Sequence, residues 1–175
     1  MDALRELVLE HDVHPQDVAE LRVGTSSNVL NALRYREPQN ELQAKFSIPF
    51  TMAIILLRRQ AGIREFTDEV VTSSQVREIM RRVSPYLHPE IEAKGFDRIR
   101  SLLELRLKDG RVLTREAHTS RGTPERPMTR QELAEKFREC AQGVLAPERV
   151  EQVLETVYRL ERLDRVGALT AMLVG

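Results

Sequence analysis

Histidine and cysteine, two residue types that often carry catalysis or bind metals, are scarce in this sequence. Its histidines number four and stand at His11, His14, His88 and His118. His11 and His14 are three residues apart, but Pro15 follows directly and ends any helix there. The pair therefore favours solvated or capping histidines over a metal site, and the sequence predicts no bound metal.

The single cysteine, Cys140, lies on the apolar stripe of a predicted helix. This placement favours a small core residue over a nucleophile. One cysteine excludes an internal disulfide framework and suits a reducing cytosol. The sequence also contains no glycine-rich phosphate loop, nucleophile elbow, CxxC or HExxH motif.

The candidate binding residues are Tyr35, Arg36 and Lys45, which lie in or beside a polar stretch over residues 26–44. We predict a long irregular loop there, and such connections are more often functional than not. An arginine and a lysine can hold a carboxylate, and a tyrosine can add a hydroxyl. Ordinary exposed loop charges are the competing interpretation.

In the N-terminal two thirds of the chain, the sequence predicts helices and strands that do not alternate regularly. A helix is expected over 2–11, and a half-buried strand with Ala19, Leu21, Val23 and Thr25 inward. A helix over 48–60, buried on all sides and stopped at Gly62, precedes one over 74–82. Two prolines make residues 84–89 an edge segment.

A hairpin gives the clearest local pattern. Leu103, Leu105 and Leu107 alternate with charges, Asp109-Gly110 supplies a two-residue turn of positive φ, and the return strand reaches about Thr119. After a loop over 120–128, Thr129 and Glu132 form a capping box that opens a helix. Further helices follow from Pro147 and near Val166. The order predicts an α+β fold with a small, mainly antiparallel sheet, helices packed on one face and C-terminal helices.

Composition excludes several classes of function. Lys plus Arg and Asp plus Glu both number 27, so no basic footprint for nucleic acid is present. The longest apolar stretch, residues 48–57, is too short to span a bilayer. The mixed charges of the first residues predict no signal peptide. We expect one cytoplasmic domain over residues 1–175.

Several segments, in order, resemble the C-terminal domain of the MmgE/PrpD family. They include Pro38-Gln-Asn-Glu-Leu-Gln-Ala-Lys-Phe-Ser-Ile-Pro-Phe50 and the hairpin Leu105-x-x-x-Asp109-Gly110-Arg111. They continue with Gly122-Thr-Pro-Glu-Arg-Pro-Met-Thr129 and Glu132-Leu-x-x-Lys136-Phe137, and end with Val157-x-x-Leu160-Glu-x-Leu163-Asp164 and Leu169-x-x-x-Leu173. That family includes 2-methylcitrate dehydratase, cis-aconitate decarboxylase and iminodisuccinate epimerase.

The resemblance implies a lyase or isomerase that acts on small di- or tricarboxylic acids without a metal or organic cofactor. It implies that Arg36 and Lys45 contribute cations, Tyr35 a hydroxyl and the loop over 121–127 a wall. In the family, a helical domain and a Lys-x-Tyr-Pro-like segment with a histidine precede the helix that resembles Met1-Asp-Ala-Leu. We expect that domain to be absent here and the chain to be inactive alone, with no catalytic residue of its own.

Two alternatives remain open. In the first, the chain is a stand-alone, non-enzymatic dimerisation or regulatory module derived from the family. In the second, it is a small enzyme that builds a site from its own residues. The expected partners are a polycarboxylate substrate when a helical domain is present, and a second copy of the chain or a separately encoded helical partner.

Overall fold

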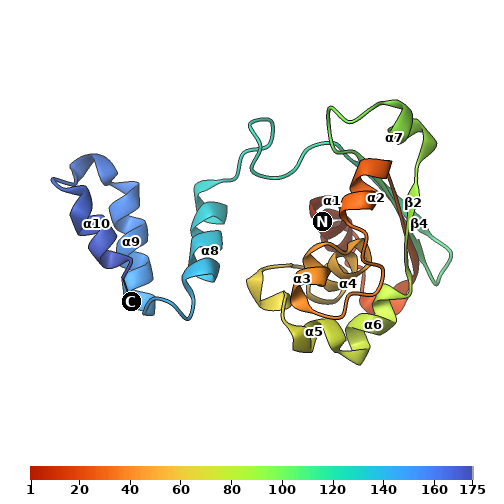
Figure 1. Cartoon of the computed structure of the whole chain (residues 1–175), viewed down its shortest axis with the longest axis horizontal. Coiled ribbons are helices and arrows are strands. Elements are labelled where there is room, and N and C mark those ends of the chain that lie inside the picture. Colours follow the sequence, from red (N-terminus) through yellow and green to blue (C-terminus); the bar gives the residue numbers. More distant parts are fainter. Residues whose placement is uncertain (175) are drawn as a thin grey trace. The chain divides into compact units, whose positions relative to one another are not determined.

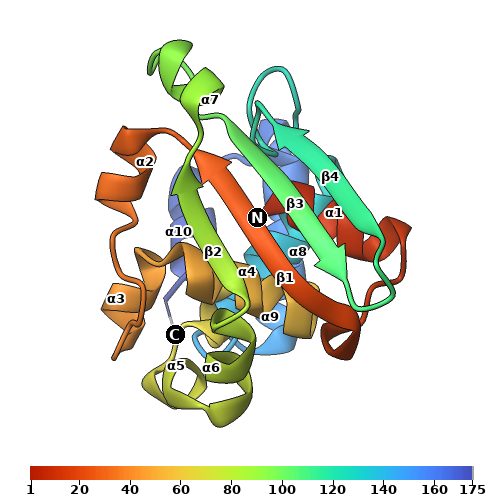
Figure 2. The same cartoon turned by 90° about the vertical axis from the view of Figure 1, so that its right-hand side faces the viewer.

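The computed structural model describes residues 1–174, which form two compact units, residues 1–126 and residues 127–174. The first unit is built on one four-stranded sheet with the order β2-β1-β3-β4 (Figure 2). The strands are β1 (Val18–Thr25), β2 (Val83–Leu87), β3 (Ser101–Leu107) and β4 (Val112–Ala117). β3 pairs antiparallel with β1 and β4, and β2 pairs parallel with β1. The predicted mainly antiparallel α+β fold is confirmed.

Helices α1 (Asp2–Glu10) and α4 (Ile48–Arg58) lie behind the sheet in Figure 2. Their apolar side chains and the inward residues of the strands form one core. Phe50 of α4 is fully buried, and its ring centroid lies 5.3 Å from that of Phe66. Burying such side chains supplies the main favourable free energy of folding. Residues of the opposite strand face, such as Arg106, are exposed, so the helices cover one face as predicted.

Shorter helices surround this core (Figure 1). They are α2 (Ser27–Ala32), α3 (Glu41–Lys45), α5 (Asp68–Thr72), α6 (Ser74–Met80) and α7 (Pro89–Ala93), with 3-10 turns at Pro15–Asp17 and Ile63–Glu65. The predicted irregular loop over 26–44 is therefore wrong in part, because α2 and α3 occupy much of it. Asn40 caps α3 by accepting a hydrogen bond from the Gln43 amide at 3.0 Å. An N-cap of this kind is a local signal that apolar periodicity does not show.

Helix α4 is buried almost all round, as predicted, but it ends earlier than Gly62. Ser47 caps its start by accepting a hydrogen bond from the Phe50 amide at 3.2 Å, which satisfies a donor that the first turn leaves unpaired. Arg59 closes its end in the left-handed conformation, with φ 57°. The buried carboxylate of Glu65 then accepts a hydrogen bond from the Gly62 amide at 2.6 Å, which holds the chain in place after the helix.

Two details of the strands differ from the sequence prediction. A register shift between Val18 and Glu20 turns Ala19 outward and places Val18 inward instead. In the hairpin, the Gly110 amide bonds the Leu107 carbonyl at 3.1 Å, and only Gly110 of the turn has a positive φ. The turn is thus a three-residue loop closed by glycine and not a two-residue turn.

The second unit consists of helices: α8 (Arg130–Ala141), α9 (Pro147–Tyr158), a 3-10 turn (Leu160–Arg162) and α10 (Val166–Met172). The capping box of Thr129 and Glu132 is present. Cys140 is exposed, so its predicted core position is wrong. Helix α8 packs through Ala134, Ala141 and the partly buried Phe137, and Cys140 lies outside this set.

Among the described residues, no helix is both long and apolar enough to cross a membrane. That residues 1–175 form a single domain stays a prediction.

Candidate anion-binding site

The segment between α2 and α3 carries Tyr35 and Arg36, and it is attached to the start of α4. Arg34 forms an isolated β-bridge with Ser47, and the Tyr35 amide donates to the Phe46 carbonyl at 3.2 Å. Because Ser47 is buried and caps α4, this backbone is held against the core of the first unit. The candidate residues therefore stand on a fixed strand-like segment and not on a free loop.

Tyr35 is half-buried, and the guanidinium carbon of Arg34 lies 5.4 Å from the centre of its ring. In the described part of the chain, the Tyr35 hydroxyl has no hydrogen-bond partner. A hydroxyl beside a cation is suited to contact an anionic substrate.

Arg36 reaches toward the edge of the sheet. Its Nη1 donates to the Pro85 carbonyl of β2 at 3.0 Å, and its side chain lines a cavity of about 320 Å³. Arg77 and Arg81, from α6 and the residue that ends it, line the same cavity. The remaining lining residues are Glu37, Pro38, Pro49, Met80 and Val83. Three arginines thus line one small cavity, and Arg36 and Arg81 are exposed to solvent.

The other two predicted residues lie outside this cavity. Lys45 is exposed at the last position of α3, and neither Lys45 nor Tyr35 lines the space. The structure brings Arg36 together with two arginines that the sequence alone did not single out. Their spacing, i and i+4 on a predicted helix, was the available signal, because such residues lie on one helical face.

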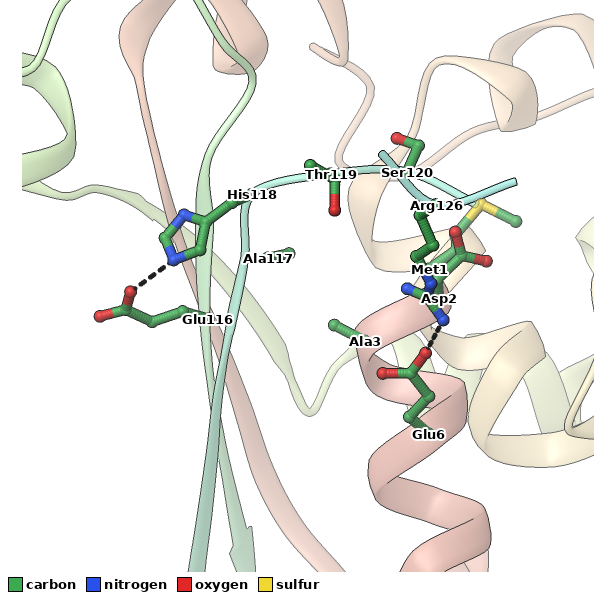
Figure 3. Close-up of a pocket in the computed structure, with 10 residues that line it drawn as sticks. All are labelled: Met1, Asp2, Ala3, Glu6, Glu116, Ala117, His118, Thr119, Ser120 and Arg126. Atoms are coloured by element: carbon green, nitrogen blue, oxygen red, sulfur yellow. Dashed lines mark hydrogen bonds and ion pairs between the residues drawn. The ribbon is translucent and has the colours of Figure 1, made fainter. Parts of the chain in front are cut away.

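A second cavity, of about 210 Å³, lies where α1 meets the end of β4 (Figure 3). Its lining includes the carboxylates of Asp2, Glu6 and Glu116. His118 contacts Glu116, with 2.8 Å between Nε2 and the carboxylate oxygen, and both side chains are at least half exposed. These carboxylates outnumber Arg126, the one arginine of the lining, which disfavours an anionic substrate.

The loop after β4 closes one side of that cavity and is attached to α1. Arg126 pairs with Glu6 (Figure 3). The Arg121 amide donates a hydrogen bond to Asp2 at 2.9 Å. Burial lowers the pKa of the Met1 amino group beside it, and the neighbouring charges of Asp2 and Glu6 act in the opposite direction. The predicted role of this loop as a wall of a substrate site stays a prediction.

Over residues 1–174, no group of three or more histidine, cysteine or carboxylate side chains is arranged to hold a metal ion. The described side chains that suit a small ligand best are therefore the arginines of the first cavity and the neighbouring Tyr35.

Comparison with known proteins agrees with the sequence motifs. Residues 1–161 match the model of the MmgE/PrpD C-terminal domain. The chain belongs to the MmgE/PrpD family. The resemblance seen in the sequence is thereby confirmed, and the match covers the first unit, α8, α9 and most of the 3-10 turn after α9.

Curated relatives are cis-aconitate decarboxylases. The mouse protein is 30% identical over 138 residues, which is 79% of this chain and 28% of the relative. The human protein is 28% identical over 171 residues, or 98% of this chain and 35% of the relative. A relative from Aspergillus terreus is 23% identical over 138 residues, or 78% of this chain and 28% of the relative. The chain spans about a third of the length of these relatives.

Proposed function

We propose that this chain is the C-terminal part of a MmgE/PrpD-type lyase or isomerase for small di- or tricarboxylic acids, and that it supplies groups that bind the substrate. The observation that carries the proposal is the family match over residues 1–161, together with relatives named cis-aconitate decarboxylase. The identities, 30% and 28%, support the chemical class of the substrate and leave the particular acid to experiment.

The proposed chemistry removes a proton next to a carboxylate and then loses CO2 or water, or returns the proton to the same carbon. Such a reaction needs a positioned base and cations that stabilise the carboxylates and the developing enolate charge. In this proposal Arg36 and Lys45 supply positive charge, and the hydroxyl of Tyr35 donates to a substrate oxygen.

Proton transfer in this proposal belongs to a helical domain outside this chain. His118 is a weak candidate for the base, because the carboxylates of Asp2, Glu6 and Glu116 surround its cavity. A polycarboxylate would meet like charges there. Arg36 and His118 thus line different cavities of the first unit, which supports a division of labour between this chain and a helical partner.

The test is a turnover assay with cis-aconitate and 2-methylcitrate, in which the chain is combined with a separately expressed helical domain of a family member. We expect activity that falls at least tenfold, roughly the effect of losing one charge-assisted contact, in Tyr35→Phe and Lys45→Ala. Arg106→Gln, a substitution on the uncovered face of the sheet, is the matched control and should retain full activity.

Two results would overturn the proposal. Stable association with the helical domain but no turnover of either acid would favour the non-enzymatic module. Full activity of both Tyr35→Phe and Lys45→Ala would remove these residues from the substrate site.

A further inference from the structure

The cavity beside Arg36 gathers positive charge without matching carboxylate contacts. Many arginines of the first unit form ion pairs within 4.0 Å of a carboxylate, among them Arg22, Arg58, Arg59, Arg82, Arg100, Arg111, Arg115 and Arg126. Arg36, Arg77 and Arg81 form none with the described residues, although Glu37 also lines the cavity. Three guanidinium groups and one carboxylate leave the lining with an excess of positive charge.

The fold places these like charges together at a cost. Arg77 and Arg81 are four residues apart along α6 and its C-terminal end, a spacing at which like charges destabilise a helix. Arg36 is added from a different part of the chain by its 3.0 Å hydrogen bond to the Pro85 carbonyl. A bound anion would remove this repulsion, because it would accept hydrogen bonds from several guanidinium groups at once.

Most guanidinium donors in the cavity are available for such a ligand. A guanidinium carries five N–H donors. Arg36 uses one on Pro85, and Arg77 has a 3.3 Å contact with the Gln39 side-chain oxygen. The Arg81 side chain has no hydrogen bond to the described residues.

Four of the five other residues that line the cavity are apolar. Met80 and Val83 are 6% and 7% exposed, and Pro38 and Pro49 are buried. Arg36 and Arg81 are exposed, so water and salt partly screen their attraction for an anion. The volume is about 320 Å³, which lies at the lower end of the range for small-molecule sites.

We propose that Arg36, Arg77 and Arg81 form a binding site for a small oxyanion that carries two or more negative charges. The site shares Arg36 with the proposed substrate site, whereas Arg77 and Arg81 belong to this site alone, and no turnover is needed to fill it. A free polycarboxylate and inorganic phosphate share the required chemistry, and the experiment separates them.

The experiment is isothermal titration calorimetry of the whole chain with propane-1,2,3-tricarboxylate and, separately, with inorganic phosphate. Acetate and potassium chloride at matched ionic strength serve as monovalent controls, because ionic strength by itself changes the interactions between exposed charges. We expect saturable binding of at least one of the two multivalent probes and none of the controls. The probe that binds more tightly shows whether the site is built for a polycarboxylate or for phosphate.

The variants assign the binding to the cavity. Arg77→Gln and Arg81→Gln should each weaken the tighter probe about tenfold or more, the effect of losing one charge-assisted contact. Arg106→Gln removes an arginine that forms no ion pair with the described residues and lies on the uncovered sheet face, so it should leave the affinity unchanged.

The inference is wrong if neither multivalent probe binds more tightly than acetate, or if both arginine variants bind as well as the original chain. Melting curves without ligand show whether each variant is folded. Should Arg77→Gln fail to fold, Arg81→Gln still decides the matter, because its side chain makes no hydrogen bond to the described residues that the fold would lose.

Discussion

Gly24 of β1 lies beneath the ring of Tyr86, and replacing it by alanine tests how the sheet is held at β2. A Cβ atom at Gly24 would lie 2.8 Å from both Cζ and Oη of Tyr86 and 3.0 Å from Cδ2 of His88. Contacts shorter than 3.0 Å to a Cβ atom essentially never occur in folded proteins, so the tyrosine ring must move. The φ angle of Gly24 is not positive, so backbone strain adds nothing to the effect.

The cost follows from what Tyr86 would lose. Its hydroxyl donates to Glu104 at 2.8 Å, and the guanidinium carbon of Arg22 lies 4.5 Å from its ring centre. A hydrogen bond to a charged group contributes about 1.5–3 kcal/mol, less where solvent screens it. The exposed cation–π contact adds about 0.5–1 kcal/mol. Alanine also reduces the conformational entropy of the unfolded chain, which offsets about 0.4–1 kcal/mol of this loss. Gly24→Ala should therefore destabilise the protein by about 1–3 kcal/mol.

Urea unfolding followed by circular dichroism measures this change, and the melting temperature should fall by roughly 4–8 °C for a loss of about 2 kcal/mol. The decisive control is the same substitution in a Tyr86→Ala background. There the cost should shrink to near zero, since most of the clash is gone and only the His88 contact remains. An undiminished cost in that background would refute the reasoning.

Three further substitutions test local contacts. Glu65 is 4% exposed and accepts a 2.6 Å hydrogen bond from the Gly62 amide. Glu65→Ala should therefore cost about 2 kcal/mol in urea unfolding, and a loss within experimental error contradicts this. Hydrogen bonds from the Ser27 hydroxyl and then its amide lower the pKa of Glu92 below its usual 4.5. The carboxylate thus stabilises the fold above that pH and loses this effect as pH falls. Ser27→Ala should flatten the acid side of the stability curve, and an unchanged curve would exclude the effect. Thr129→Ala removes a capping box. It should lower the hydrogen-exchange protection of α8 by about 1 kcal/mol, whereas equal protection would show that the cap is dispensable.

The fold was largely predictable because its main elements depend on local patterns. The alternating leucines of β3, the capping box at Thr129 and the apolar run of α4 each specify one element. What failed depends on contacts between distant segments or on single hydrogen bonds. Ala19 turns outward because of a bulge opposite β3, and no pattern within β1 reveals a bulge. Helix α3 depends on the Asn40 cap, which a reading of apolar periodicity overlooks.

The candidate site was predicted less completely. The sequence singled out Arg36 by its place in a polar segment, whereas the arginines beside it come from α6, much later in the chain. The sequence did not single out Arg77 and Arg81, because nothing local shows that a segment from another part of the chain closes a cavity against them. What distinguishes these arginines is the cavity that they share, which is visible only in three dimensions.

One measurement tests the central claim most directly: proton NMR of cis-aconitate mixed with the chain alone. We expect saturation-transfer signals from the bound acid, reduced in Lys45→Ala, and no new resonances as the sample ages. Conversion of cis-aconitate by the unaided chain would contradict the claim that proton transfer comes from elsewhere. A complete lack of binding would contradict the claim that the chain holds polycarboxylates.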